Sequence, residues 1–510
     1  MSEDLTRRRL FRLAAASAAG AAGLSLSGCT DGTGSRPKVT PPATDGSAGP
    51  PFLSRPDLTP PHITITRHGP GGDSRYIFLN APYSGPGHGG TIILDPQGEF
   101  VWFGPNTAAH HRMNFSVQNY QGHPVLTWYQ GLVTGGFGRG QLIIADSSYK
   151  ILHVIQPANG DLADFHEFVV TPQDTALITV YRRHSGVDLR AVGGPSRGHI
   201  TSGVIQEIDI ATGKLLFEWD SWDDSHPPVE VAESYQKRGV GDGGDGSAGR
   251  PYNYFHINSL AIDEDGDLLV SARNTCAVYK VSRKSGKIVW RLNGKKSDFM
   301  MAPRSKFWWQ HHVRPHSNER LTMFDNAANG PIVNEMQSRA IILRLDTHAM
   351  RATLEKAYIH PGQTMLAGAM GSAQLLDGGR MFVGWGTQPH FSEFSANGRL
   401  LLDGDIEKGD ASYRAFRQDW TGYPTELPAA AARHRTGGAT VYASWNGATQ
   451  VSSWTVYAGK TQTSLAEVAS AHRAGFETAI AVRSAGPYFA VQPHDAAGRP
   501  LSRSAPVRMA

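Results

Sequence analysis

The sequence is poor in cysteine and in net charge, and each shortage excludes a class of protein. Its 510 residues include two cysteines, Cys29 and Cys276, which excludes a disulfide-stabilised scaffold and a cysteine-rich zinc module. The net charge is +4, and it falls to +2 without residues 1–28, which hold four arginines and two acids. So small a charge argues against a dedicated nucleic-acid-binding protein, and no nucleic acid is expected as a partner.

Glycine and proline, in contrast, are abundant. The 57 glycines and 31 prolines make up about a sixth of the chain, against a usual ~12 %. Because 40 % of the residues are hydrophobic, the chain can still bury a core, and the excess indicates many turns rather than disorder. The length exceeds that of one ordinary core and predicts two or more domains.

The N-terminus has the pattern of an export signal. Arg7–Arg12 precedes an apolar run, Leu13–Leu26, which at roughly 15 residues is shorter than the ~20 that span a bilayer. The order Arg-Arg-Leu-Phe resembles a twin-arginine signal, and Leu26-Ser-Gly-Cys29 resembles a bacterial lipobox. We therefore expect residues 1–28 to be a signal peptide and Cys29 to carry a lipid.

The alternative for this segment is a simple secretory signal with an incidental cysteine. In the first case the protein is anchored to the outer face of the bacterial cell membrane, and in the second it is secreted. Residues 29–61 are rich in Pro, Gly, Ser and Thr and are expected to form a disordered tether. The unpaired Cys276 lies in a strand-like stretch and is expected to be buried.

One unit of two hairpins recurs along the body of the chain, with period-2 alternation and glycine turns. The outer hairpins are expected at Thr91–Trp102, Leu142–Ile155, Ile205–Trp219, Val278–Trp290, Ile341–Tyr358 and Phe391–Leu402. The inner hairpins are expected at Met113–Gln130, His166–Tyr181, His256–Arg273, His311–Asn326 and Gly371–Gly386. A glycine-rich insertion, Gly239–Arg250, lengthens one interval.

Six four-stranded units at this spacing predict an all-β fold with a six-bladed β-propeller over residues 62–422. The first blade lacks a strand, and a late segment such as Tyr413–Arg417 is expected to close the ring. Residues 423–510 alternate differently, with Trp445, Trp454 and Tyr488 as candidate core residues. They predict a small C-terminal β-sandwich of fibronectin type III character.

Three inner hairpins open with a histidine: His166, His256 and His311. Their partner strands end in Tyr181, Arg273 and Asn326. Equivalent positions of different blades face the same axial channel, and Asn258 shares a strand face with His256. The register therefore predicts one pocket that collects these side chains. The alternative is that they fill the polar axis of the propeller. Three histidines on separate blades carry no metal-ligand spacing, so no metal is expected.

At these residues the chain resembles the arylsulfotransferase family. The resemblance spans roughly Thr91–Trp420 and rests on several motifs taken together. They are Asp164-Phe-His-Glu-Phe168, Tyr254-Phe-His-Ile-Asn-Ser259, Ser271-Ala-Arg-Asn274, Trp290–Phe299, Gln310-His311, Phe324-Asp-Asn326, Gly384-Trp-Gly386 and Ser412-Tyr-Arg414.

The resemblance implies an extracytoplasmic enzyme that moves a sulfuryl group from a phenolic sulfate ester to a phenol, without phosphoadenosine phosphosulfate or another cofactor. It implies a nucleophilic histidine in a His-x-Asn strand, here His256 with Asn258, in ping-pong kinetics through a sulfohistidine. It further implies roles for Arg273, His166 and, as a third histidine, His311.

The residue types suit that chemistry. A neutral imidazole nitrogen can take the sulfuryl group, while Arg273 and Asn258 hold its oxygens. His166 or His311 would protonate the leaving phenolate and deprotonate the incoming phenol. Asn326 would line the pocket. Two further side chains would either stack on the substrate ring or pack in the core: Tyr181 and Trp128.

Two other functions remain open at this stage. One is a non-catalytic propeller that binds a carbohydrate or an anionic ligand at the cell surface. The other is hydrolysis, in which water takes the place of the phenol. The chain also departs from its relatives at Gln310-His-His312, where they often show Gln-His-Asp, so the acid that would orient His311 is missing.

Overall fold

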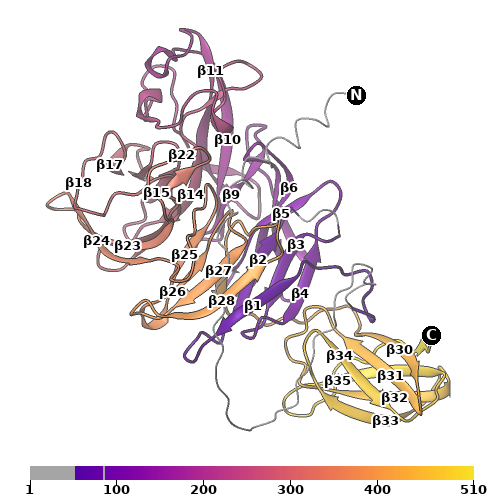
Figure 1. The fold of residues 1–510 in the computed structure, drawn as a ribbon. Helices are drawn as coiled ribbons and strands as arrows, with labels where there is room; N and C mark the ends of the chain where they lie inside the picture. The colour runs from indigo at the N-terminus through magenta and orange to yellow at the C-terminus, as the bar shows by residue number, and fades with distance from the viewer. Residues whose placement is uncertain (1–51, 84–86) are drawn as a thin grey trace, which may run out of the picture. The chain divides into compact units, whose positions relative to one another are not determined.

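The computed structural model describes residues 52–83 and 87–510. The expected signal peptide, Cys29 and most of the expected tether lie outside these residues. The described chain is an all-β protein built from antiparallel sheets (Figure 1). No helix in this part of the chain has the length and apolarity to cross a membrane.

The first three units run from β2 to β12. The first unit holds β2 (Tyr76–Ala81), β3 (Gly90–Leu94) and β4 (Phe100–Pro105). The second holds β5 (His111–Tyr120), β6 (His123–Thr134), β7 (Phe137–Ala145) and β8 (Ile151–Ile155). The third holds β9 (Ala163–Val170), β10 (Thr175–Val187), β11 (Gly198–Asp209) and β12 (Leu215–Asp220). A pairing of β7 with β9 joins the second and third units into one sheet, and β13 (Tyr252–Asn253) pairs with β11.

The next three units follow in the same way. The fourth holds β14 (Ile257–Ile262), β15 (Leu268–Ala272), β16 (Ala277–Val281) and β17 (Ile288–Asn293). The fifth holds β19 (His311–His316), β20 (Arg320–Asp325), β23 (Arg339–Asp346) and β24 (Arg351–Tyr358), with β18 (Met300–Met301) on β24. The sixth holds β25 (Ser372–Leu376), β26 (Arg380–Gly384), β27 (His390–Phe394) and β28 (Leu400–Ile406).

Short elements connect these strands. They are β21 (Ala328–Asn329), β22 (Ile332–Val333) and four 3₁₀ turns at Arg190–Val192, Val231–Glu233, Gly241–Gly243 and Asp377–Gly379. Every hairpin expected from the sequence is found as a pair of adjacent antiparallel strands. In the two clearest hairpins the turn glycines, Gly213 and Gly286, have φ values of 72° and 68°, which glycine adopts without steric cost.

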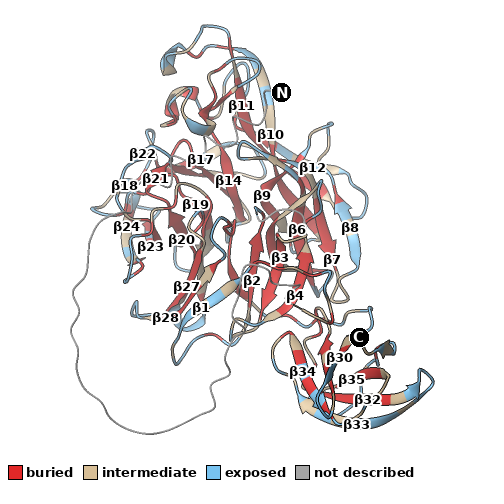
Figure 2. Cartoon of the chain, turned by 45° about the vertical axis from the view of Figure 1, so that its right-hand side comes forward, coloured by how far each residue is buried: buried red, intermediate tan, exposed pale blue. Residues whose placement is uncertain are grey.

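The two ends of this region interlock. Strand β29 (Phe416–Gln418) pairs with β2, which completes the first unit, and β1 (Ile63–His68) pairs with β28 on the outside of the sixth. The sequence expected the late strand at Tyr413–Arg417, so its position is shifted towards the C-terminus. The inner strands of the six units are largely buried, whereas outer strands such as β1 and β8 are largely exposed (Figure 2). Cys276 is free and buried as expected, and burial raises the pKa of its thiol to about 12.

The end of the segment expected to be a tether makes defined contacts. The amide and hydroxyl of Ser54 donate to the Glu477 carboxylate, at 2.6 and 2.5 Å. The rings of Phe52 and Phe476 lie 4.3 Å apart, and Leu58 is buried. Residues 52–58 therefore pack against the folded chain, because their few apolar side chains find partners that local composition does not reveal.

The C-terminal region forms two further sheets. One has the order β30 (Ala429–Arg435), β31 (Gly438–Ser444), β34 (Glu477–Val482). The other has the order β33 (Ser464–His472), β32 (Ser453–Thr461), β35 (Tyr488–His494), β36 (Val507–Arg508). Trp454 lies in the shared core as expected, but the core aromatic of β35 is Phe489, whereas Tyr488 is half-buried.

Candidate active site

The structure brings the three register histidines and Tyr181 into one buried cluster. The ring of His166 lies 4.9 Å from that of His256, and Tyr181 lies 5.7 Å from both. His311 is buried near the same group, because its Nε2 accepts the Met370 N–H and Arg273 donates to the carbonyl of Gly368, two residues earlier. The three histidines and Tyr181 therefore lie close together, as the register of the hairpins predicts.

Hairpin β14–β15 carries the centre of the cluster. His256 immediately precedes β14 with a φ of 55°, and its carbonyl accepts the backbone N–H of Arg273 at 2.9 Å. The turn out of β15 thus holds the arginine beside the histidine. Burial and the nearby His166 and Arg273 keep the pKa of His256 well below its ordinary value, so its imidazole is neutral at neutral pH.

His166 forms a dyad with Asp164. Its Nδ1 lies 2.5 Å from Asp164 Oδ1, and the other oxygen of this carboxylate accepts the N–H of Gly138 at 2.6 Å. Because a carboxylate can only accept here, the Nδ1 of His166 carries the proton and Nε2 is left for acid–base chemistry. Asp164 belongs to the motif Asp164-Phe-His-Glu-Phe168, but nothing in the spacing of that motif predicts that it binds His166.

His311 is oriented by neutral groups. Its Nδ1 lies 2.7 Å from Asn326 Oδ1 and 3.1 Å from the Trp309 carbonyl, so this nitrogen donates. Nε2 then holds the lone pair, and it accepts the N–H of Met370 at 3.2 Å. Burial and Arg273 hold the pKa of His311 well below its ordinary value. Asn326 is therefore a partner of His311.

His312 does not replace the missing acid. Its Nδ1 meets the backbone of Ala373, with the carbonyl at 3.2 Å and the N–H at 3.3 Å. It lines a separate cavity of about 280 Å³ together with Glu167, Arg314 and Arg414. A larger cavity, of about 550 Å³, is lined by residues such as Tyr120 and Trp420 and by none of the three register histidines.

Arg273 is buried and already holds partners. Nη1 donates to Asp242 Oδ2 at 2.9 Å, and Nη2 donates to Asn329 Oδ1 at 2.5 Å and to the Gly368 carbonyl at 2.9 Å. Within the described chain its Nε has no hydrogen-bond partner. Asp242 and Asn329 come from connecting segments, which carry no register that sequence analysis could use.

Asn258 has a different environment from the one expected. Its amide nitrogen donates to the Gln310 carbonyl at 2.6 Å, which ties β14 to the segment before β19. Its Oδ1 is buried and has no partner among the described residues. A carbonyl oxygen repels an anion, so the side chain as placed here orients the strand rather than facing sulfuryl oxygens.

The two candidate aromatic side chains separate. Tyr181 borders the histidines, donates its hydroxyl to the Ile257 carbonyl at 2.5 Å and packs edge-on against Phe137. Trp128 instead packs in the core between β5 and β7, with Phe115 and under Arg112. Phe137, 5.9 Å from the ring of His256, is an aromatic neighbour that the sequence analysis did not identify.

A buried ion pair lies beneath the cluster. Glu167 accepts from Arg414 at 2.6 and 2.9 Å and from Arg314 at 2.8 Å. Arg414 also donates to the carbonyls of His166 and Asn258, at 2.9 and 3.1 Å. Burial would raise the pKa of Glu167, but the two arginines outweigh it and lower the pKa, so the carboxylate stays charged.

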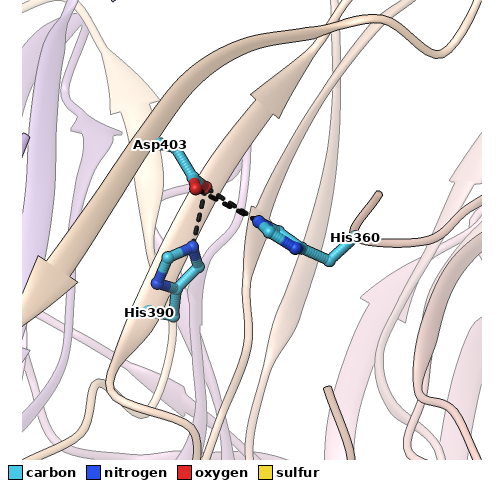
Figure 3. Close-up of side chains that lie close together, drawn as sticks. All are labelled: His360, His390 and Asp403. Carbon is cyan, nitrogen blue, oxygen red and sulfur yellow. Dashed lines mark hydrogen bonds and ion pairs between the residues drawn. The ribbon is translucent and has the colours of Figure 1, made fainter. Parts of the chain in front are cut away.

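A second cluster, His360, His390 and Asp403, has ligand atoms within 4.8 Å of one another (Figure 3). His390 lies between two carboxylates, 2.7 Å from Asp403 and 2.6 Å from Asp405. His360 Nδ1 accepts two backbone N–H groups at 3.2 Å, so its Nε2 carries the proton and donates to Asp403. A metal-bound histidine donates from its free nitrogen instead. The hydrogen bonds thus indicate a proton-sharing network rather than a metal centre.

The fold and the site together define an all-β protein in which two neutral histidines, a histidine–aspartate dyad and an arginine are buried together. The sequence profile of the arylsulfotransferase (ASST) family matches residues 116–408, more than half of the chain. The chain belongs to the arylsulfotransferase family. This membership supports an arylsulfotransferase activity in general, with a small-molecule sulfate donor and a phenol acceptor.

No curated protein matches the sequence significantly. Among solved structures, the chain is similar to a protein of unknown function from Bacteroides caccae, with 12 % identity over 67 % of this chain and 98 % of that one and a TM-score of 0.40. It is similar to catalytically inactive virginiamycin B lyase from Staphylococcus aureus with quinupristin, with 8 % identity over 72 % of this chain and 95 % of that one and a TM-score of 0.35. A third similar structure is the periplasmic gluconolactonase of Pseudomonas aeruginosa, with 12 % identity over 86 % of this chain and 97 % of that one and a TM-score of 0.37.

The network around His390 predicts a pH-dependent stability. Burial would lower the pKa of His390, but Asp403 and Asp405 outweigh it and raise the pKa. When the pKa of a histidine is higher in the folded than in the unfolded protein, its protonation contributes to stability. This contribution is complete below the unfolded pKa of ~6.5, and it is lost as pH rises through the folded pKa. We expect the difference in unfolding temperature between the wild type and His390→Gln to shrink from pH 5.5 to pH 9. His434→Gln, exposed on β30, is the matched control, and a pH-independent difference would contradict the assignment.

Proposed function

We propose that this protein is an arylsulfotransferase that transfers a sulfuryl group from a phenolic sulfate ester to a phenol through a sulfohistidine, in ping-pong fashion and without phosphoadenosine phosphosulfate. The observation that carries the proposal is the buried cluster of two neutral histidines, the His166–Asp164 dyad and Arg273. Family membership supports the same reaction class.

The nucleophile must present a bare nitrogen lone pair, which requires a proton acceptor at the other ring nitrogen. The family resemblance implies this role for His256, whose Nδ1 lies 2.7 Å from the Asn253 amide nitrogen, while the Asn253 oxygen has no partner in the described chain. Turning the amide about its bond would let that oxygen accept from Nδ1 and leave Nε2 free. His311 is the second candidate, since its Nδ1 already donates to Asn326, but its Nε2 would first have to lose the hydrogen bond from the Met370 N–H.

The reaction then has two balanced steps. In the first, the imidazole nitrogen forms a bond to sulfur while the bond from sulfur to the phenolic oxygen breaks, and protonated His166 gives its Nε2 proton to the leaving phenolate. In the second, the phenol loses its proton to His166 and attacks the sulfur, which frees the nucleophile. Arg273 stabilises the sulfuryl oxygens, in keeping with a transfer that depends on positioning and charge.

We also propose that the six units form the blades of a propeller closed by β29, and that a fibronectin type III-like sandwich follows it in the chain. The strand orders support both: consecutive four-stranded units with a late strand completing the first, and a three-stranded sheet on a four-stranded one. An experimental structure in which β29 leaves β2 would overturn the ring.

The first prediction concerns the intermediate. Purified protein given 4-nitrophenyl sulfate should release nitrophenol faster when phenol is added, and a peptide containing the nucleophile should gain the mass of a sulfuryl group. Alanine at the true nucleophile, His256 or His311, should remove both signals, whereas alanine at the other should retain the adduct.

Each outcome of this experiment is informative. Release that does not depend on phenol would show hydrolysis, and release that survives both substitutions would refute a histidine nucleophile. Absence of any release would favour the alternative function, a propeller that binds a ligand without catalysing a reaction.

The second prediction concerns His166. His166→Ala and Asp164→Asn should slow turnover of phenyl sulfate by roughly 10²–10⁴-fold, the usual contribution of a general acid. The loss should be much smaller with 4-nitrophenyl sulfate, because nitrophenolate leaves without protonation. His153→Ala, on the outer strand β8, serves as control. Equal losses with both esters would show that His166 has another role.

We further propose that the protein is exported by its N-terminal signal and anchored through a lipid on Cys29, as Leu26-Ser-Gly-Cys29 suggests. The wild type should then fractionate with membranes and enter the detergent phase of Triton X-114, whereas Cys29→Ser should appear in the soluble exported fraction. Cys276→Ser should behave like the wild type. Identical partitioning of the wild type and Cys29→Ser would contradict the anchor.

A further inference from the structure

The glycine-rich insertion Gly239–Arg250 places a carboxylate inside the candidate active site. Asp242 Oδ2 lies 2.9 Å from Arg273 Nη1 and 3.6 Å from His256 Nδ1. The side chain of Asp242 is 20 % exposed, while those of both partners are 4 % exposed. The carboxylate therefore stands between the solvent and the two groups that the reaction needs.

The backbone of the insertion is built to hold this position. Gly244 has a φ of 65°, and a Cβ there would lie 1.9 Å from the Pro251 carbonyl oxygen, so no other residue fits. The Gln236 amide nitrogen donates to the Val240 carbonyl at 2.7 Å, next to the 3₁₀ turn that carries Asp242. The base of the loop is thus fixed.

The loop and the arginine also share one hydrogen-bond network. Gln236 Oε1 accepts from the Asn329 amide at 2.5 Å, and Asn329 Oδ1 accepts from Arg273 Nη2 at 2.5 Å. Arg273 is consequently held from two sides, by Asn329 through one amino group and by Asp242 through the other. Asp242 is the more exposed of these two partners, so it is the one that a ligand from solvent would meet first.

Charge determines what can replace the carboxylate. His256 and His311 are neutral, and Asp164 is paired with His166, so Asp242 balances the charge of Arg273. A sulfuryl group brings one negative charge and needs the same guanidinium donors. Two anions on one buried arginine repel each other strongly, because the surroundings screen them poorly.

We propose that Asp242 is an internal anion that occupies the sulfuryl subsite on Arg273, and that the sulfate donor binds by displacing it. Asp242 thereby determines the affinity of the site for an anionic donor, because the donor must compete with the carboxylate for the guanidinium. The proposal rests on the proposed function in taking Arg273 as the group that receives the sulfuryl oxygens.

The test measures anion binding directly, with inorganic sulfate as the probe and isothermal titration calorimetry as the readout. Asp242→Asn, which keeps the shape and removes the charge, should bind sulfate at least about tenfold more tightly than the wild type. Asp245→Asn is the matched control: it lies three residues further along the same loop, where its carboxylate accepts the Ser247 N–H at 2.9 Å. It should bind sulfate like the wild type, and Asp242→Asn combined with Arg273→Gln should lose the gain.

A kinetic readout separates displacement from catalysis. With 4-nitrophenyl sulfate, Asp242→Asn should lower KM while kcat changes by no more than a few-fold. A fall in kcat at unchanged KM would overturn the proposal and make Asp242 part of the catalytic machinery. Sulfate binding in Asp242→Asn no tighter than in Asp245→Asn would also overturn it.

The outcome is distinguishable from failure of the proposed function. If no variant turns over an aryl sulfate but Asp242→Asn binds sulfate more tightly through Arg273, the displaceable anion stands and the sulfotransferase assignment falls. Asp242→Ser provides a second neutral variant should the asparagine protein be poorly folded, as judged by its unfolding temperature.

Discussion

The buried ion pair between Glu167 and Arg414 is the contact on which the candidate site depends. Arg414 comes from the segment before β29, Glu167 from β9, and the second arginine on Glu167, Arg314, from β19. Through its donation to the carbonyls of His166 and Asn258, Arg414 also ties β9 to β14, which belong to different sheets. Breaking such a pair by removing one partner costs about 3–5 kcal/mol, so the strands that present the histidines share one electrostatic support.

The roles of the histidines are distinguished by their second nitrogen rather than by position. His166 faces a carboxylate, His311 an amide and a carbonyl, and His256 an asparagine amide. The carboxylate fixes the proton of His166 on Nδ1, whereas burial and the nearby Arg273 hold the pKa values of His256 and His311 low and keep both imidazoles neutral. Three side chains of one type can thus share a transfer reaction without competing for the same proton.

Most of the fold could be predicted because hairpins leave a local signature, in alternation and in turn glycines such as Gly213 and Gly286. The same register predicted that His166, His256, His311 and Arg273 would meet. The contacts of Asp242, Asn329 and Asn253 could not be predicted. These residues lie in a connecting loop or in two-residue strands, which show no alternation that would relate them to the hairpins. Strands β30 and β33 carry no such signature, since an alanine-rich run and a half-exposed polar edge show little contrast between their two faces.

The interlocked ends of the hairpin region constrain how this chain is made. Strand β2 begins at Tyr76, but its partner β29 does not exist until the ribosome has passed Gln418. The first unit must therefore wait, incomplete along one edge, for nearly the whole of translation, and its closure is a contact of very high sequence separation. During that interval its unpaired edge is open to other strands. Synthesis and final assembly are thus separate events for this molecule, and the interval between them is when a chaperone would be of most use.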